Sequence, residues 1–131
     1  MSDDLYHQQI LDHYRHPQNF GKLPHADHII TETNASCGDS FTFYLKLNKP
    51  LPLEKGELEG VVIKGISFTG TGCAISTAAS SLLTQHLQGK SVEEINNIDQ
   101  TFMQHLIGVK VTPARLKCLM LPAKALESLK R

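Results

Sequence analysis

The sequence predicts an α+β fold, in which a small antiparallel three-stranded sheet has helices packed on one side. Three strand-like segments follow one another in the first half of the chain with no helix between them, which is typical of an antiparallel meander. After Gly70-Thr71-Gly72 the pattern changes to segments with helical spacing and helix-capping residues. Strands first and helices afterwards indicate one sheet with a helical layer.

A first helix is expected over residues 3–15, because Ser2 can cap it and two aspartates follow at its positive end. Tyr6, Ile10 and Tyr14 recur every four residues and predict its buried stripe.

Three segments have strand character: residues 28–34, 41–48 and 61–68. The middle one alternates apolar and polar side chains, with Phe41, Phe43, Leu45 and Leu47 on one face, which is the period of a half-buried strand. The third is rich in β-branched residues and apolar on parts of both faces, so we expect it to be well covered.

The second half predicts four helical segments. A helix over residues 74–88 ends at Gly89, and Ser91 with Glu94 has the pattern of a capping box that opens a short helix. Another helix is expected over residues 99–107.

The last helix starts at Thr112-Pro113, an N-cap followed by proline at the first helical position. It is expected to run toward Arg131, with Pro122 kinking or interrupting it.

Size and charge limit the possible functions. The 131 residues are expected to form a single domain, and 13 basic against 13 acidic residues give no net charge. Neither a nucleic-acid partner nor a membrane partner is indicated, because there is no basic excess, no apolar run of membrane length and no basic signal-like start. We therefore expect a cytoplasmic protein.

Three cysteines, Cys37, Cys73 and Cys118, are too few and too scattered for a disulfide framework. Cys73 is expected at a helix start, where the helix dipole favours the thiolate, and Cys118 follows Arg115 and Lys117, whose positive charges do the same. Each thiol therefore has a local reason to be reactive.

Cys37 and Asp39 are two residues apart around Gly38, so their side chains can point the same way and converge on one ion. With Cys73 and Cys118 they would make four ligands, enough for a tetrahedral zinc ion or the edge of an iron–sulfur cluster. The alternative is that the three cysteines are buried separately and that Asp39 only hydrogen-bonds its own turn.

Other polar residues suggest less chemistry. Five histidines lie near the N-terminus without ligand spacing, so a surface or capping role is expected for them: His7, His13, His16, His25 and His28. The serines of residues 74–81 have no nucleophile motif and indicate close helix packing. From Lys110 onward six Lys or Arg residues accompany a single Glu127, which indicates a solvated helix face or a docking surface for an acidic partner.

Four motifs in order resemble the IscU/NifU/SufU family. They are YHQQILDHYRHPQNFG at residues 6–21, NASCGD at 34–39, GTGCAIS at 70–76 and PARLKC at 113–118. The resemblance implies an IscU/NifU-like fold and a role in iron–sulfur cluster biogenesis, with sulfur received as persulfide from a cysteine desulfurase. It also implies that Cys37, Asp39, Cys73 and Cys118 form the site.

The branches of the family differ in their third motif. IscU-type scaffolds have a histidine just before the third cysteine and an LPPVK segment that a chaperone recognises, whereas this chain has Lys117 and VTPAR. Lys117 is typical of SufU-like proteins, which resemble zinc-bound sulfur acceptors, but the spacing from Cys73 to Cys118 is as short as in IscU.

The leading hypothesis is an iron–sulfur cluster assembly protein, either a scaffold or a zinc-dependent sulfur acceptor. It would use zinc or iron and a transient [2Fe-2S] cluster, with Cys118 or Cys37 as the attacking thiolate. Its partners would be the desulfurase and the carrier or apo-proteins that accept the product. The alternatives are a structural zinc module that binds a protein partner and, with less support, a cysteine hydrolase, for which no histidine base is evident.

Overall fold

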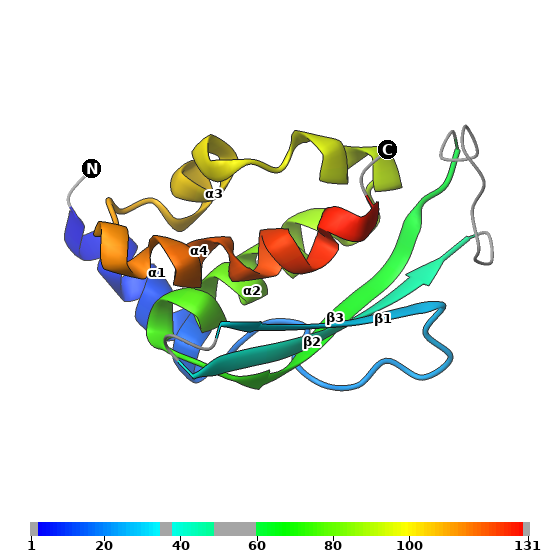
Figure 1. Cartoon of the computed structure of the whole chain (residues 1–131), viewed down its shortest axis with the longest axis horizontal. Coiled ribbons are helices and arrows are strands. Elements are labelled where there is room, and N and C mark those ends of the chain that lie inside the picture. Colours follow the sequence, from blue (N-terminus) through cyan, green and yellow to red (C-terminus); the bar gives the residue numbers. More distant parts are fainter. Residues whose placement is uncertain (1–2, 35–37, 49–59, 130–131) are drawn as a thin grey trace.

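The computed structural model describes residues 3–34, 38–48 and 60–129. The elements follow one another as α1 (Asp3–Arg15), β1 (His28–Asn34), β2 (Asp39–Leu47), β3 (Ile63–Thr71), α2 (Ala74–Leu87), the 3-10 helix η1 (Val92–Asn97), α3 (Gln100–Ile107), α4 (Pro113–Ala125) and the 3-10 helix η2 (Leu126–Leu129). The sheet has the order β1-β2-β3 with both pairs antiparallel, and the helices lie on one side of it (Figure 1). The predicted α+β fold is confirmed.

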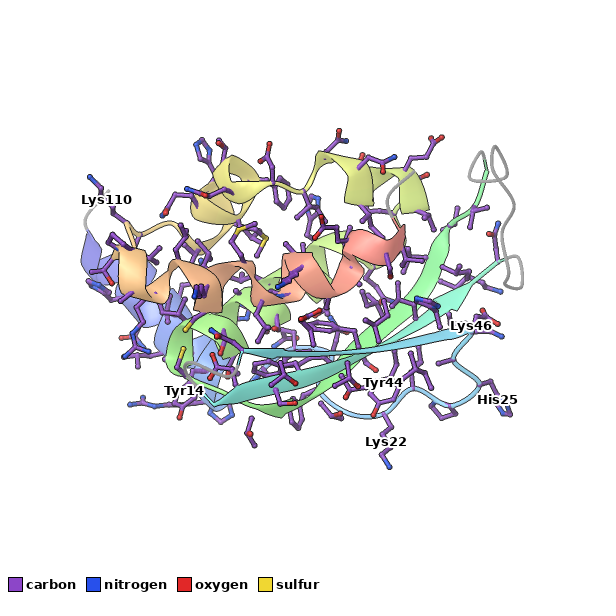
Figure 2. The ribbon with its side chains drawn as sticks, viewed as in Figure 1. Tyr14, Lys22, His25, Tyr44, Lys46 and Lys110 are labelled. Atoms are coloured by element: carbon purple, nitrogen blue, oxygen red, sulfur yellow. The ribbon has the colours of Figure 1, made fainter. Side chains whose placement is uncertain are left out.

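β2 is the central strand and has the predicted alternation. Its apolar side chains face the helices and are at most 3% exposed, whereas Thr42, Tyr44 and Lys46 are half-buried on the other face. Figure 2 shows Tyr44 on the side of the sheet away from the helices, with Lys22 and His25 of the α1–β1 connection. The pleat therefore separates a packed face from a polar one.

The third strand is displaced from its predicted position, since β3 spans Ile63–Thr71 rather than residues 61–68. Val61 and Val62 pair with the start of η1, since the Val61 carbonyl accepts the Val92 N–H and Val62 forms a bridge to Ser91. Toward β2, Val62 bonds, among the described residues, only to Asn48, beyond the end of that strand. At the other end the strand continues because Thr71 pairs with Ser40. Tertiary pairing thus shifted a strand whose β-branched composition had been identified correctly.

The outer edge of β3 is covered by other parts of the chain. The Phe68 N–H donates to Asn19 and the Phe68 carbonyl accepts from Gly21, both in the α1–β1 connection. Further along, the Gln88 side-chain amide accepts from the Ile66 N–H at 3.1 Å and donates to the Lys64 carbonyl at 3.0 Å, so it acts as a short piece of neighbouring strand. These backbone groups are therefore satisfied on the side of β3 away from β2.

The core lies between the sheet and the helical layer, to which α2, α3 and α4 all contribute buried side chains. Phe41, Phe43 and Phe68 are at most 1% exposed and their rings lie against one another, with centroids 5.8 Å apart for Phe41–Phe68 and 5.9 Å for Phe43–Phe68. Burying one such side chain contributes roughly 1.5–3 kcal/mol. The small residues of α2 are buried and allow the helix to approach the sheet closely. This confirms the prediction that the serines of residues 74–81 serve helix packing.

Two expectations for the helices are corrected. Ile10 is buried as predicted, but Tyr14 is 45% exposed, because the last turn of α1 meets α2 through His13, three residues after Ile10. Tyr6 belongs to α1, but its side chain lies outside the described part.

Pro122 does not interrupt α4, which continues to Ala125 before η2; packing of the buried face of α4 outweighs the loss of one backbone hydrogen bond. Ser91 caps η1 by accepting the Glu93 N–H.

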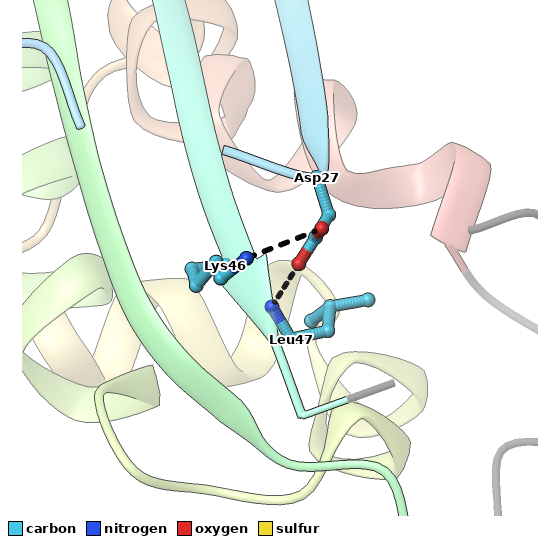
Figure 3. Close-up of polar contacts among 3 residues, drawn as sticks. All are labelled: Asp27, Lys46 and Leu47. Carbon is cyan, nitrogen blue, oxygen red and sulfur yellow. Dashed lines mark hydrogen bonds and ion pairs between the residues drawn. The ribbon is translucent and has the colours of Figure 1, made fainter. Parts of the chain in front are cut away.

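Asp27 holds the C-terminal end of β2, at Lys46 and Leu47 (Figure 3). The Asp27 carboxylate accepts the Leu47 N–H at 2.8 Å and lies 3.5 Å from the Lys46 ammonium.

Among the helices of the described part of the chain, none is long and apolar enough to cross a membrane.

His13 joins α1 to α2 and predicts a pH dependence of stability. The Ser81 hydroxyl oxygen accepts the Gln18 N–H at 2.7 Å and lies 2.6 Å from Nδ1 of His13, an arrangement in which a neutral imidazole accepts the hydroxyl proton. Burial lowers the pKa of His13 below its ordinary 6.5, partly offset by the negative charge of Asp12. The unfolded chain therefore takes up this proton first as the pH falls.

We expect the contribution of His13 to be complete above about pH 6.5 and to be lost as the pH falls through its lower folded-state pKa. The measurement is urea unfolding between pH 5 and 8 (about one and a half units either side of the ordinary value) for the wild type, His13→Gln and the exposed-histidine control His7→Gln. The loss at low pH should be smaller in His13→Gln and unchanged in His7→Gln. Parallel profiles for the wild type and His13→Gln would contradict it.

Candidate metal centre

Three of the predicted site residues come together at one end of the sheet. Asp39 is the first residue of β2, Cys73 caps α2, and Cys118 lies in α4. Their ligand atoms all lie within 4.8 Å of one another. Cys37 lies outside the described residues, two positions before Asp39 in the chain.

Two glycines allow the close approach of the elements that carry these residues. Gly70 has φ +139, and a Cβ on it would lie 2.1 Å from the Ser40 carbonyl oxygen; a Cβ on Gly72 would lie 2.5 Å from Oγ of Ser76. The Gly70-Thr71-Gly72 motif is therefore a steric requirement of the β3–α2 turn against β2. Gly38, with φ +73, supplies the predicted bend before Asp39.

Asp39 is 1% exposed, and its carboxylate connects two of these elements. Oδ1 accepts the Cys73 backbone N–H at 3.1 Å, while Oδ2 lies 3.9 Å from the Cys73 sulfur. The alternative that Asp39 serves only its own turn is wrong, because the carboxylate reaches across to the start of α2. One oxygen is held by the backbone and the other faces the sulfur.

Cys73 is the N-cap of α2, and its sulfur accepts the Ser76 backbone N–H at 3.4 Å. Burial by itself raises the pKa of Cys73, but hydrogen bonds from the Ser76 hydroxyl, the Ser76 N–H and the Cys118 thiol lower it; the Asp39 charge raises it. The net pKa lies below the ordinary value, because the three hydrogen bonds together outweigh burial and the carboxylate. The site therefore favours a thiolate at Cys73.

Cys118 is fully buried, whereas Arg115, one turn earlier on α4, is exposed. A hydrogen bond to Cys118, followed by attraction to the Cys73 and Cys118 sulfurs, raises the pKa of the Arg115 guanidinium. Arg115 thus brings a positive charge to the two sulfurs. Lys117, the other cation predicted beside Cys118, lines a hollow between α4 and the end of β1.

Ser76 is a residue of the site that the sequence analysis assigned to helix packing. It is fully buried, its hydroxyl lies 3.5 Å from the Cys73 sulfur, and it donates to the Cys73 carbonyl at 3.2 Å. The signal was its place three residues after the N-cap, where capping partners occur. Its N–H donates to the sulfur and its hydroxyl is shared between the sulfur and the Cys73 carbonyl, so Ser76 orients the sulfur and stabilises its negative charge.

Two alternatives can now be judged for the described residues. Separate burial of the cysteines is wrong for Cys73 and Cys118, which belong to one cluster. The N-terminal histidines are not part of that cluster: His7, His16 and His25 are exposed, and His13 contacts Ser81.

A family model and a sulfurtransferase both match nearly the whole of this chain. The family model described as the NifU-like N-terminal domain matches residues 5–129. The zinc-dependent sulfurtransferase SufU of Bacillus subtilis (strain 168) is 34% identical over an alignment of 143 residues, covering 95% of this chain and 88% of the relative.

A second relative has a different activity in its name. The iron–sulfur cluster assembly scaffold protein IscU of Thermotoga maritima is 34% identical over 144 aligned residues, covering 97% of this chain and 94% of the relative. The crystal structure of FiSufU, a SUF-system protein of Fervidobacterium islandicum AW-1, is 28% identical with a TM-score of 0.67 and covers 99% of this chain and 100% of that one. The similarity extends over nearly the whole chain in sequence and in fold.

Proposed function

The chain belongs to the family of NifU-like N-terminal domains, and from that premise we propose that it works in iron–sulfur cluster assembly, receiving sulfur at a centre made of Cys37, Asp39, Cys73 and Cys118. The observation that carries the proposal is the convergence of Asp39, Cys73 and Cys118 from three elements. The hydrogen bonds to Cys73 and the positive charge of Arg115 stabilise thiolate sulfur in this cluster, and thiolate is the form that binds a metal ion or attacks a persulfide.

The donor set suits zinc or ferrous iron. Thiolate sulfur binds both metals well, and a single carboxylate oxygen among sulfurs is compatible with a tetrahedral site. Cys37 would complete it as the third thiolate. The name of the Bacillus relative includes zinc, and that of the Thermotoga relative includes the iron–sulfur cluster, which supports a metal at this centre in either case.

Sulfur transfer at this centre is a thiolate exchange. A Cys118 or Cys37 thiolate attacks the terminal sulfur of the desulfurase persulfide; a new sulfur–sulfur bond forms, the old one breaks, and the desulfurase cysteine leaves as thiolate. Attack by Cys118 requires that this buried side chain is first uncovered by the approaching desulfurase. No net oxidation occurs in that step. Release of the sulfur as sulfide then takes two electrons from a thiol or protein reductant. Arg115 stabilises the acceptor thiolate before the attack, and the negative charge then leaves with the desulfurase cysteine.

Anaerobic incubation distinguishes a scaffold from a sulfur acceptor. The metal-free chain is mixed with a cysteine desulfurase, cysteine, a thiol reductant and ferrous iron, and iron and acid-labile sulfide per chain are counted after small molecules are removed. Equal retained iron and sulfide, lost in Cys37→Ser, Cys73→Ser and Cys118→Ser, mean a scaffold. Faster desulfurase turnover by the zinc form with nothing retained means a sulfur acceptor. If both are absent, the proposal is wrong.

We expect Asp39→Ala to make an assembled cluster more persistent, because a weakly held oxygen ligand is the point at which the cluster opens. The variant also leaves the Cys73 N–H without its buried acceptor, at a cost of about 1–3 kcal/mol of stability. The measurement is the decay of the cluster absorbance after addition of chelator.

Asp27→Ala is the matched control, since that carboxylate holds the other end of β2 through Leu47 and Lys46 (Figure 3). It should lose stability without changing cluster decay. A cluster lost faster in Asp39→Ala than in the wild type would contradict the role given to Asp39.

The structural zinc module makes a different prediction about folding. Zinc-dependent domains unfold when the metal is removed, because they lack a sufficient core. Here Phe41, Phe43 and Phe68 form a buried cluster that includes no ligand, so we expect the chelated chain to keep a cooperative thermal transition at a lower midpoint. Circular dichroism during a melt with and without chelator tests this. Loss of the transition on chelation would favour the structural module.

A further inference from the structure

A hollow of about 250 Å³ lies between α4 and the end of β1. Lys117 and Lys124 are seven residues apart, two helical turns, and therefore share the face of α4 that borders the hollow. Met120 and Leu121 lie between them on the same helix, and Thr33 and Asn34 line the β1 side. The hollow thus combines two ammonium groups with an apolar surface.

Neither lysine is neutralised by the described part of the chain. Both are exposed, and no carboxylate of a described residue lies within 4.0 Å of either ammonium group. Lys124 also lines a neighbouring hollow together with Asp99 and Glu127, but neither of these carboxylates lies within 4.0 Å of its ammonium group. The two positive charges are therefore available to a ligand.

Asn34 adds a hydrogen-bond donor. Its side-chain nitrogen is buried and has no hydrogen-bond partner among the described residues. Buried amide groups are normally satisfied, and the terminal torsion of asparagine rotates readily, so the amide can turn toward an acceptor that enters the hollow. Amide and ammonium donors on one hollow select an oxyanion.

The hollow is also next to the candidate centre. Lys117 precedes Cys118 in the chain, and Asn34 pairs with Asp39 in the β1–β2 register. A protein that approaches the cysteines therefore reaches this hollow as well.

We propose that this hollow binds the carboxylate of a glutamate or aspartate side chain of a partner protein. Its volume is below the roughly 300–1,000 Å³ of pockets that enclose whole small molecules, but it accommodates one acidic side chain. The methylene groups of a glutamate would lie on Met120 and Leu121, and its carboxylate would receive donors from Lys117, Lys124 and Asn34. The proposal draws on the proposed function only for why a partner comes here, because carboxylate binding is tested without metal or desulfurase.

The test uses methionine-methyl NMR of the full, reduced, metal-free chain. The probes are N-acetyl-glutamate N-methylamide, its neutral glutamine counterpart and sodium phosphate, all at constant ionic strength. Met120 reports on the hollow, and Met103, fully buried outside it, is the internal control. We expect a saturable shift of Met120 with the glutamate compound only.

Charge variants identify the site. Lys117→Gln combined with Lys124→Gln should weaken binding of the glutamate compound about tenfold. Lys64→Gln combined with Lys90→Gln changes the net charge equally at exposed lysines elsewhere and should leave it unchanged. Asn34→Ala should weaken binding, and thermal melts check that each variant is folded.

Other results would overturn the proposal. Equal shifts with the glutamine compound, equal loss in both lysine pairs, or no shift of Met120 would each refute a carboxylate site. Tighter binding of phosphate than of the glutamate compound would assign the hollow to a free inorganic oxyanion instead of a partner side chain. None of these results bears on sulfur transfer, so failure here leaves the proposed function separately testable.

Discussion

Gly70→Ala is expected to destabilise the chain by about 4 kcal/mol, a large part of the stability of a typical domain. Gly70 has φ +139, and the added methyl would lie 2.1 Å from the Ser40 carbonyl oxygen and 2.8 Å from Cα of Phe41. Both are backbone atoms of β2, so no side-chain rotation relieves the clash. The β3–α2 turn would have to move away from β2 and take Cys73 with it.

Gly89→Ala is the matched control for this substitution. Gly89 has a similar left-handed requirement, with φ +81, but no atom lies within 4 Å of the added Cβ. It should cost only about 1–2 kcal/mol. Urea unfolding of both variants measures the difference, and if Gly70→Ala does not produce soluble protein, the intermediate Gly72→Ala is measured instead. Equal losses at Gly70 and Gly89 would refute the close approach of the turn to β2.

Cys118→Ser is expected to weaken zinc binding by about a hundredfold. Four-ligand zinc sites provide about 10–16 kcal/mol, so one thiolate accounts for about 3 kcal/mol. The substitution also removes a hydrogen bond that lowers the pKa of Cys73 and a partner of Arg115. The measurement is competition for zinc with a chromophoric chelator at constant pH.

Ala123→Ser separates ligand loss from a disturbance of the helix. Ala123 is buried on the same helix, so the variant introduces a hydroxyl there without removing a thiolate. It should bind zinc like the wild type, even if its stability falls. Wild-type zinc affinity in Cys118→Ser would exclude Cys118 from the centre.

The strands could be predicted well because their pattern is local. Alternation from Phe41 to Leu47 fixed which face of β2 is buried, and Gly38 indicated the turn before it. The start of β3 could not be predicted, because Val61 and Val62 pair with residues about 30 positions later, a long-range contact that no local pattern contains. Tyr14 was misjudged because its periodicity is equally compatible with a helix face centred on His13.

The candidate centre could be predicted in part, because its cysteines and carboxylate lie in short local motifs. The helix start predicted a thiolate at Cys73, which its lowered pKa confirms, and the sequence also predicted that Asp39 and Cys118 lie beside it. The resemblance to the family is confirmed by the match over residues 5–129. Which cation lies against the sulfurs could not be read from sequence, since Arg115 and Lys117 are both near Cys118 in the chain but face different surroundings. Ser76 was missed because its neighbours on α2 are also small and polar.

The covered edge of β3 has a consequence for self-association. Strands of separate molecules can join only where a sheet offers unpaired backbone groups, and the Gln88 amide with the Asn19–Gly21 segment occupies those of Lys64, Ile66 and Phe68 in the middle of β3. Among the described strands, β1 is therefore the edge at which we expect pairing between copies. Because both molecules then use their β1 edge, the joined sheet closes as a two-fold dimer and cannot extend into a fibre.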